Sequence, residues 1–455
     1  MSSLTLYGIR RILDGGIPLT LGSASLDGVP HVNLLSHAEY VDSQHVALTF
    51  QFFNRSRDNI MATRRACLMV EDPVTGHSLA LRLRYLRTET SGPIFERLRA
   101  KLAGIAAHTR MENVFRLRGA DVYEVLDIEA TQQGAQLPTL APRCDLAAGA
   151  RAVSARLADC NELAALPQIA MDGLRDDLAV HHAILWLLDE HRRSLYALAS
   201  LGYAEAGIGA ELPLDEAGLA GIAVREGVAL RIGHMARMYR YGRTLHAAAR
   251  EHGMLDGAAQ REPIALPGLV TPCSQLAVPL RARGRTVGVL LVESESDQFF
   301  GYDDEDALAV LCAQLAQALT TLQSAELEVP TVPEGAAPLA RPDGAPLRLR
   351  YFARDGTVFI DDQYLIKGVA GAILWKVAHD AHVSGRSSFT TRELRLAGDS
   401  LGLPEVQDNL GVRLLLLQRR LADWGGPLQI EKTRRGCYAM VVNRRLELER
   451  IDDAP

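Results

Sequence analysis

The chain has 455 residues, which at about 100–200 residues per domain predicts roughly two to four domains rather than one large core. Its residues are 48% hydrophobic and 23% charged, without low-complexity tracts, and this excludes disordered, collagen-like and coiled-coil rod proteins. The formal net charge is −6. It gives no overall attraction to nucleic acid or anionic lipid, so any basic surface must be local.

The six cysteines are far apart and form no C-x-x-C pair, which argues against a zinc ribbon, a thioredoxin-like site or a secreted disulfide scaffold. The first residues, MSSLTLYGIRR, lack the apolar core of a signal peptide. No apolar run approaches the roughly 20 residues that span a bilayer. We therefore expect a cytoplasmic protein with reduced thiols and no membrane-spanning segment.

Two stretches have the composition of joints between domains. Residues 326–346 hold five prolines among small and charged residues, as in a semi-extended linker, and residues 131–150 are a weaker example. We expect an N-terminal domain at 1–132, a middle domain at 150–325 and a C-terminal domain at 347–455, each of ordinary size.

The N-terminal domain is expected to be mainly β structure. Its apolar and polar residues alternate, with turn signals at Asp27-Gly28 and Asp72-Pro73, and this pattern is typical of strands. Arginines at 82, 84 and 87 alternate with leucines, which suits a sheet with one wet face. The expected elements are strands at 45–50, 66–72 and 78–89 and a helix at 94–107.

The middle domain opens with an amphipathic segment, continues with apolar runs of strand length and closes with a long apolar helix, an order that predicts the α+β class. The closing helix has leucines at near-heptad intervals. They indicate either a dimer seam or a face that covers the domain's own sheet. The expected elements are helices at 151–178 and 303–325 and strands at 183–188, 194–201, 275–281 and 286–293.

The C-terminal domain combines small strands with three helices, which suggests a winged helix. Eight basic residues and two acidic ones lie within residues 409–445, where the last helix and a hairpin meet. A DNA reader needs such a helix for the major groove and cations for the phosphates. The expected elements are strands at 347–352 and 357–361, helices at 366–381, 390–399 and 405–424, and a hairpin at 428–442.

About 100 residues of this domain resemble the winged-helix effector domain of two-component response regulators. The resemblance is carried by FIDD at 359–362, AGAILWKVAHDA at 370–381, SFTTRELRLA at 388–397, NLGVRLLLLQRRLADW at 409–424 and LQIEKTRRGCYAMV at 428–441. It implies that 409–424 is the recognition helix and that the hairpin is the wing. The candidate residues for binding double-stranded DNA are Arg413, Gln418, Arg419, Arg420, Lys432, Thr433, Arg434 and Arg435.

The recognition helix departs from the pattern of that family. Its outward face carries Gly411, Leu415 and Leu416, where the family has polar side chains, and these residues cannot read base edges by hydrogen bonds. Three interpretations stay open. The leucines pack on a partner protein or on thymine methyl groups, the domain relies on its arginines and Gln418, or the arginines are only a solvated face.

Most of the middle domain resembles a GAF domain, a small-ligand sensing module. The resemblance rests on residues 182–203, 218–232, 274–294 and 299–319. It implies that the segment 232–272 closes over a small-molecule effector, whereas Cys273 lacks the following His typical of bilin attachment. The candidate ligand contacts are His234, Met235, Met238, Tyr239, Tyr241 and His246. Side chains at such spacing are more often packing than ligation, so we predict no metal site.

The N-terminal domain resembles the split barrel of the pyridoxamine phosphate oxidase group over residues 16–50 and 54–72. In that group a basic turn holds the FMN phosphate, and here the turn is Ser56-Arg57-Asp58, with an acid where lysine is usual. FMN, haem or another flat cofactor, and a cofactor-free dimerisation barrel all stay open. The residues implied in FMN binding are Thr49, Gln51, Asn54, Arg55, Ser56 and Arg57.

The sequence thus predicts a multidomain α+β protein with an N-terminal split β-barrel, a central GAF sensor domain and a C-terminal winged helix. No paired carboxylates, Ser-His-Asp pattern or nucleotide-binding glycine loop indicates catalysis. We expect a homodimeric, one-component transcription regulator that responds to a ligand or to redox state and is not an enzyme. The alternatives are a flavin-dependent oxidoreductase with regulatory attachments and a protein-interaction scaffold.

Overall fold

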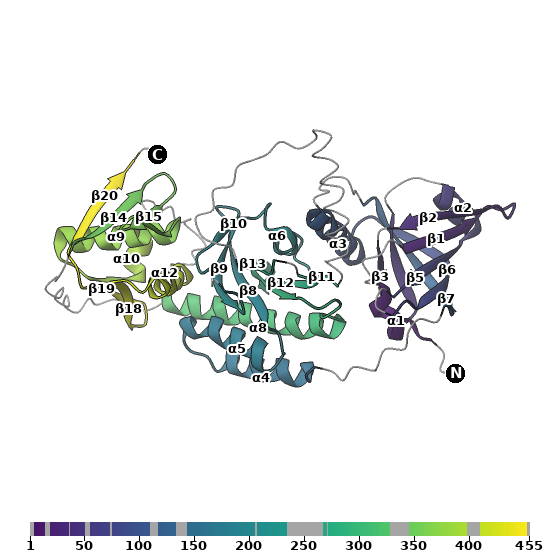
Figure 1. Ribbon diagram of the computed structural model, residues 1–455, viewed down its shortest axis with the longest axis horizontal. Helices are drawn as coiled ribbons and strands as arrows, with labels where there is room; N and C mark the ends of the chain where they lie inside the picture. Colours follow the sequence, from purple (N-terminus) through teal and green to yellow (C-terminus); the bar gives the residue numbers. More distant parts are fainter. Residues whose placement is uncertain are drawn as a thin grey trace.

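The computed structural model describes residues 4–13, 19–35, 37–50, 55–72, 75–109, 117–132, 143–204, 207–233, 267–270, 272–327, 345–397 and 410–452. Figure 1 shows them as three blocks along the long axis of the molecule, with the middle block between the other two.

The N-terminal block is a curled antiparallel sheet with helices at its rim. Its elements are α1 (Leu6–Leu13), β1 (Leu19–Ala24), β2 (Pro30–Leu35), β3 (Ala38–Tyr40), β4 (His45–Phe50), α2 (Arg55–Thr63), β5 (Arg65–Glu71), β6 (Ser78–Glu89), α3 (Pro93–Thr109) and β7 (Gly119–Gln132). The seven strands lie in the order β2-β1-β5-β6-β7-β4-β3. The strands expected at 45–50 and 78–89 are confirmed with the same bounds, and the expected helix is α3.

The alternation in β6 holds only over its first part. Leu81 and Leu83 are buried while Arg82 and Arg84 are exposed, as predicted for one wet face. The register between β6 and β7 then shifts between Tyr85 and Arg87. Leu86 is two residues from Arg84, so the period of two itself places Leu86 on the exposed face and not with Leu81 and Leu83, and after the shift Arg87 is exposed as well.

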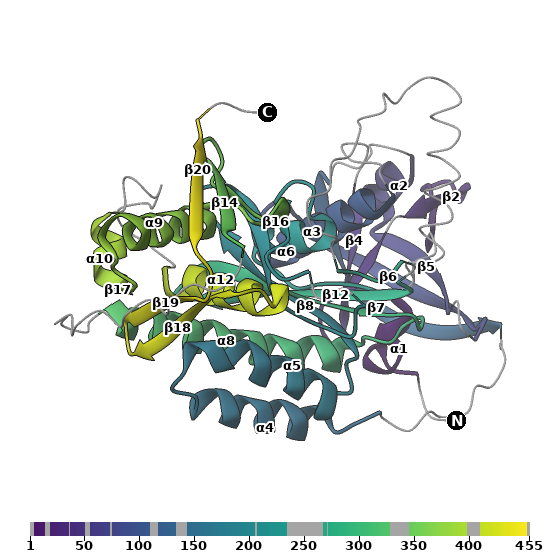
Figure 2. The same ribbon diagram turned by 60° about the vertical axis from the view of Figure 1, so that its left-hand side comes forward.

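The middle block has a six-stranded antiparallel sheet between helices. Its elements are α4 (Leu146–Ala158), the 3-10 helix η1 (Leu163–Ala165), α5 (Leu166–Asp176), β8 (His182–Asp189), β9 (Ser194–Leu201), β10 (Glu211–Pro213), α6 (Gly218–Glu226), β11 (Leu230–Ile232), β12 (Ser274–Ala282), β13 (Arg285–Ser294) and α8 (Tyr302–Leu327). The strand order is β10-β9-β8-β13-β12-β11. Helices α4, α5 and α8 lie together on one side of this sheet (Figure 2), and α6 packs on β12 and β13.

The single helix expected at 151–178 is wrong, because the segment forms two helices. The chain leaves α4 at Asp159, whose amide still bonds to the carbonyl of Ala155. Pro167 then opens α5 at its first turn, a position where the missing N–H costs nothing. The amphipathic pattern therefore continues across a break in the helix.

Helix α8 covers the sheet with its leucines. Leu308, Leu311, Leu315 and Leu319 are each at most 2% exposed and belong to the apolar core. Residues Tyr302–Ser324 are also long and apolar enough to cross a membrane by length and composition alone. Their inner face is packed against β12, so the apolar residues are accounted for by the core of the block.

The C-terminal block has two small sheets around three described helices. Its elements are β14 (Leu347–Phe352), β15 (Thr357–Ile360), β16 (Gln363–Ile366), α9 (Val369–Ser384), β17 (Ser388–Thr390), α10 (Thr391–Leu396), α12 (Leu410–Trp424), β18 (Leu428–Arg434), β19 (Cys437–Val442) and β20 (Leu446–Ile451). The sheets have the orders β16-β15-β14-β20 and β17-β19-β18. The start of α10 is fixed by a capping box, in which the Thr390 side chain bonds to the Glu393 amide and the Glu393 side chain bonds back.

The apolar core does not stop at the boundary between the middle and C-terminal blocks. One cluster of buried residues contains Leu311 and Leu315 of α8, Leu349 of β14 and Leu414 and Leu417 of α12. The N-terminal block has apolar clusters of its own. Two blocks are therefore joined by apolar packing, and the third is attached differently.

Candidate functional site

Helix α12 is enclosed on all sides, although it carries most of the expected DNA contacts. Leu414, Leu415, Leu416 and Leu417 are each at most 4% exposed. Consecutive helical residues point in directions about 100° apart, so four buried neighbours leave no solvated face along this turn. The helix packs on α9, β16 and β18 of its own block and on α8 and η1 of the middle block.

Arg413 is turned toward the middle block. Its Nη2 lies 2.6 Å from Oδ2 of Asp189, at the end of β8, and the two side chains are 11% and 8% exposed. Its guanidinium carbon also lies 4.1 Å from the ring centroid of Tyr196 on β9. A planar cation held by a carboxylate and an aromatic ring is anchored in both position and orientation.

Arg419 is held in the same interface by backbone groups. Its Nη1 donates to the carbonyl of Leu198 at 3.2 Å, and its Nη2 donates to the carbonyl of Ala164 at 3.1 Å. Burial lowers the pKa of this guanidinium from its ordinary value of 12.5, because a charge is disfavoured away from water. The group nevertheless stays charged at neutral pH.

Arg420 and Gln418 serve the C-terminal block itself. Arg420 donates from Nε to the carbonyl of Leu365 at 2.9 Å and pairs with Asp423 at 2.8 Å. Gln418 donates from Nε2 to the carbonyl of Ile430 at 3.0 Å. Both side chains join α12 to neighbouring strands of its own block.

The hairpin residues are divided between the interface and solvent. Lys432 lies 3.4 Å from the carboxylate of Glu162 in the middle block. Thr433 bonds to the carbonyl of Cys437 and Arg434 donates to its sulfur, both at 3.3 Å. Arg434 and Arg435 are exposed at the turn that joins β18 to β19.

The cofactor residues expected in the N-terminal block do not form a phosphate cradle within the described part of the chain. Arg57 pairs with Asp121, donates to Thr88 at 3.1 Å and stacks 3.7 Å from the ring centroid of Phe50. The Thr49 hydroxyl donates to the carbonyl of His37 at 3.3 Å. Gln51 and Asn54 lie outside the described residues.

The first turn of α2 contains groups that favour anion binding and one group that opposes it. The Ser56 hydroxyl is buried and has no hydrogen-bond partner among the described residues, and Arg55 is exposed beside it. Asp58 is exposed in the same turn, and its carboxylate repels an anion there. With the charge of Arg57 neutralised by Asp121, these residues do not fit the FMN phosphate.

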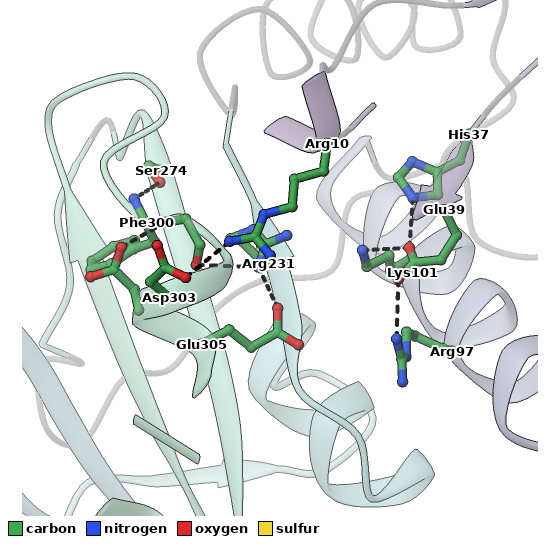
Figure 3. Close-up of polar contacts among 12 residues, drawn as sticks. Arg10, His37, Glu39, Arg97, Lys101, Arg231, Ser274, Phe300, Asp303 and Glu305 are labelled. Atoms are coloured by element: carbon green, nitrogen blue, oxygen red, sulfur yellow. Dashed lines mark hydrogen bonds and ion pairs between the residues drawn. The ribbon is translucent and has the colours of Figure 1, made fainter. Parts of the chain in front are cut away.

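A buried charged cluster, missed in the sequence, joins β3 to α3 (Figure 3). Glu39 is 2% exposed and accepts from Lys101 at 2.7 Å, His37 at 3.3 Å and Arg97 at 3.4 Å. Burial alone would raise the pKa of Glu39, but the charge of Lys101 and the bond to His37 outweigh it and hold this pKa well below its ordinary value of 4.5. The cluster fixes α3 on the sheet of its own block.

A second set of arginines joins the N-terminal and middle blocks (Figure 3). Arg231 on β11 has a side chain 1% exposed, pairs with Glu305 and donates to the carbonyl of Gly301 at 3.3 Å. Its guanidinium lies 3.9 Å from the Tyr302 ring centroid, and Arg10 of α1 lies 4.9 Å from the same ring. Arg10 also pairs with Asp303 at 2.9 Å.

The predicted ligand contacts of the middle block, His234, Met235, Met238, Tyr239, Tyr241 and His246, lie outside the described residues. The sheet face that carries Trp186, Leu195 and Ala197 is described, and it packs mainly on α6. The Trp186 Nε1 is buried without a hydrogen-bond partner among the described residues. In the described ranges, no group of three or more His, Cys, Asp or Glu side chains is placed to hold a metal ion.

Residues 160–320 match the model of the GAF domain family. This part of the chain is therefore a GAF domain, as the sequence predicted. A GAF domain indicates ligand-responsive regulation or signalling as the class of function. None of the curated proteins compared with the chain matches it.

Three solved structures are similar to parts of the chain. The GAF domain of an Acinetobacter phosphoenolpyruvate-protein phosphotransferase is 23% identical, covering 39% of this chain and 94% of that one, with a TM-score of 0.31. A free methionine-R-sulfoxide reductase from Neisseria meningitidis is 18% identical, covering 42% and 98%, with a TM-score of 0.30. An FMN-binding protein from Syntrophomonas wolfei is 14% identical, covering 29% and 88%, with a TM-score of 0.23.

Proposed function

We propose that the protein is a cytoplasmic, one-component transcription regulator. In this proposal the GAF domain binds a small-molecule effector, and the C-terminal block is a winged helix that binds double-stranded DNA. The curled N-terminal sheet is a split barrel that joins two subunits. The chain acts as a regulator and not as an enzyme.

The observation that carries the proposal is the arrangement of the C-terminal block. Three strands, β14, β15 and β16, precede α9, β17, α10 and α12, the hairpin of β18 and β19 pairs with β17, and β20 then returns to complete the four-stranded sheet. This order of elements supports a winged helix with α12 as its recognition helix. Arg434 and Arg435 are exposed at the hairpin turn, where cations reach DNA phosphates in such domains.

The test is DNA binding by the Arg434→Ala, Arg435→Ala double variant. Each lost phosphate contact lowers affinity on every sequence and reduces the slope of log affinity against log salt by about one unit. A matched control replaces Arg348 and Arg450, which are exposed on the four-stranded sheet, by alanine. Equal affinities and salt slopes for wild type and the hairpin variant would remove the hairpin from the DNA interface, and a map of genomic occupancy without discrete promoters would reject the proposal.

The proposed subunit contact lies on the edge of the N-terminal sheet. Val32 and Leu34 on β2 are 64% and 68% exposed, and Leu26 and Val29 of the preceding turn are also exposed. Apolar side chains gathered on an edge strand are characteristic of interfaces. Val32→Glu with Leu34→Glu should therefore yield monomer in sedimentation, whereas Val383→Glu with Leu396→Glu, also at exposed positions, should not. A monomeric wild-type protein contradicts the dimer.

A second candidate function is a protein-interaction scaffold. The sequence suggests it through Leu415 and Leu416, which are apolar on the recognition helix, although both pack within the chain in the cluster shared with the GAF domain. In that case α12 is a docking helix for proteins and the hairpin arginines are solvated. The scaffold is favoured if neither the wild-type protein nor a variant in which α12 no longer contacts the GAF domain binds DNA.

The flavin oxidoreductase has the least support, because the α2 turn does not fit a phosphate. Asp58→Lys replaces an exposed acid of this turn by a cation and should strengthen FMN binding if the block is a flavin barrel. Absorbance after incubation with FMN and removal of free flavin measures retention. A wild-type protein that retains FMN and turns over a reductant would promote the enzyme over the regulator.

A further inference from the structure

We propose that the GAF domain is an intramolecular competitor of DNA, which holds α12 in a closed state that cannot enter the major groove. This inference rests on the proposed function, since it describes how the proposed DNA-binding surface is controlled. It concerns the interface formed by α12, η1, β8 and β9, which we call the closed interface.

Basic side chains of α12 that are expected to bind DNA are already bound to the GAF domain. Of the three α12 arginines expected to reach DNA, Arg413 and Arg419 end on groups of the GAF domain, while Arg420 stays within the C-terminal block. A side chain bound to Asp189 or to the Leu198 carbonyl cannot at the same time bind a phosphate. Helix α12 is also in contact with α8 and η1, which occupy space that a duplex would need.

The GAF domain and the C-terminal block also face each other with complementary charges. Three GAF carboxylates face three cations of the C-terminal block, with distances of 2.6 Å for Asp189–Arg413, 3.4 Å for Glu162–Lys432 and 3.3 Å for Glu211–Lys367. Each of these carboxylates gives its cation the kind of charge-assisted contact that a phosphate gives. The GAF surface therefore offers α12 and its hairpin the same chemistry as the DNA backbone.

The closed interface includes two strands of the GAF sheet, β8 and β9. Asp189 lies on β8 and Tyr196 on β9, and both touch Arg413. The same two strands present Trp186, Leu195 and Ala197 on the opposite face, in the cluster that packs mainly on α6. Because side chains alternate across a strand, each strand has one face in the apolar cluster that includes α12 and the other in the cluster that includes α6.

Closure predicts weakened DNA binding by the wild-type chain. The apparent dissociation constant equals the intrinsic one divided by the fraction of open molecules. A ligand that binds the open state preferentially raises that fraction by no more than its differential affinity for the two states. Loss of the Asp189 charge should also raise the fraction of open molecules, without any ligand.

The experiment compares full-length wild type with Asp189→Asn and Glu162→Gln. Asp189 contacts α12 from the GAF side, while Glu162 is exposed and its replacement leaves the core untouched. The control is Asp215→Asn, which removes an exposed carboxylate that pairs with Arg225 inside the GAF domain. The two measurements are hydrogen exchange of residues 410–424 and binding to a random-sequence DNA duplex.

We expect faster exchange in α12 for Asp189→Asn and DNA binding about tenfold tighter than wild type, with a smaller change for Glu162→Gln and none for Asp215→Asn. Unchanged exchange and unchanged DNA affinity in both variants would overturn the closed state. Faster exchange without DNA binding by any variant would keep the closed interface and overturn the proposed DNA-binding function. If Asp189→Asn fails to fold, Glu162→Gln alone decides by the same two readouts.

Discussion

The GAF domain meets its two neighbours through joints of different chemistry. Toward the C-terminal block, one apolar cluster runs continuously from α8 into α12, and its charged pair Asp189–Arg413 is nearly buried. Toward the N-terminal block, α3 packs on α6 and β11, and the polar contacts pair arginines with acids, as in Arg10–Asp303 and Arg99–Glu226. Among the α3 side chains that the structure describes, Ala100 enters a GAF apolar cluster.

This difference separates two kinds of coupling. An apolar joint depends on the area removed from water and is insensitive to moderate salt. A joint of exposed ion pairs is weak and is screened by salt. The GAF domain and the C-terminal block should therefore behave as one cooperative unit, to which the N-terminal block is attached more loosely.

The largest effect is expected for Glu39→Gln, in the cluster that holds α3. Lys101 is 5% exposed, and removal of its charged partner should lower the free energy of unfolding by about 3–5 kcal/mol at neutral pH. The folded pKa of Glu39 is depressed from 4.5, so its contribution is present above that value and is lost as the pH falls below it. Urea unfolding at several pH values should show this dependence in wild type and lose it in the variant, while Glu129→Gln, at an exposed pair, stays close to wild type.

The next effect is expected for Leu416→Ala in the apolar joint. Leu416 is 3% exposed, and a buried leucine replaced by alanine costs about 2–5 kcal/mol. Unfolding should also separate into GAF and C-terminal transitions if the joint is what makes them cooperative. Leu396→Ala, at an 82% exposed position, is the control. A single transition with an unchanged midpoint in Leu416→Ala would contradict the comparison of joints.

Arg231→Gln should have an intermediate effect. Its side chain is 1% exposed and bonds to Glu305 and to the Gly301 carbonyl, and hydrogen bonds to charged groups contribute about 1.5–3 kcal/mol. The free energy of unfolding is measured by urea titration. Arg225→Gln, at a more exposed pair with Asp215, should change it less, and the reverse ranking would show that burial does not decide the strength of these pairs.

The smallest effect is expected for Arg10→Ala. Asp303 is 73% exposed, so this pair contributes at most about 1 kcal/mol. The loss should shrink further at high salt because the two charges are screened. The loss in Leu416→Ala should persist at the same salt concentration. If the loss of unfolding free energy depended equally on salt in the two variants, the two joints would not differ in their ionic and apolar character.

Several elements could be predicted from the sequence because their patterns are periodic, although the 14-residue strand β7 was missed. Strands β4, β6, β9 and β14 have the predicted bounds, since several apolar residues recur at strand spacing in each. Strands β10, β11 and β17 were missed, because three residues are too few to show a period. Such short strands form only where a neighbouring strand offers hydrogen bonds, which is tertiary information.

For the candidate site on α12, the sequence showed which residue types are present but not which residues they contact. The sequence showed that Leu415 and Leu416 could not read bases, yet their apolar cluster turns out to lie within the chain itself. Arg413 meets Asp189 across 224 positions, and nothing in either local sequence marks the other as its partner. Glu39 and Lys101 were missed for the same reason, since charged residues are ordinarily solvated.

Helix α8 runs from the N-terminal joint, where Asp303 meets Arg10, to contacts with α10 and α12. With 26 residues at 1.5 Å each it is about 39 Å long. Helix α8 therefore spans the GAF domain from the N-terminal joint to the helix that carries Arg413.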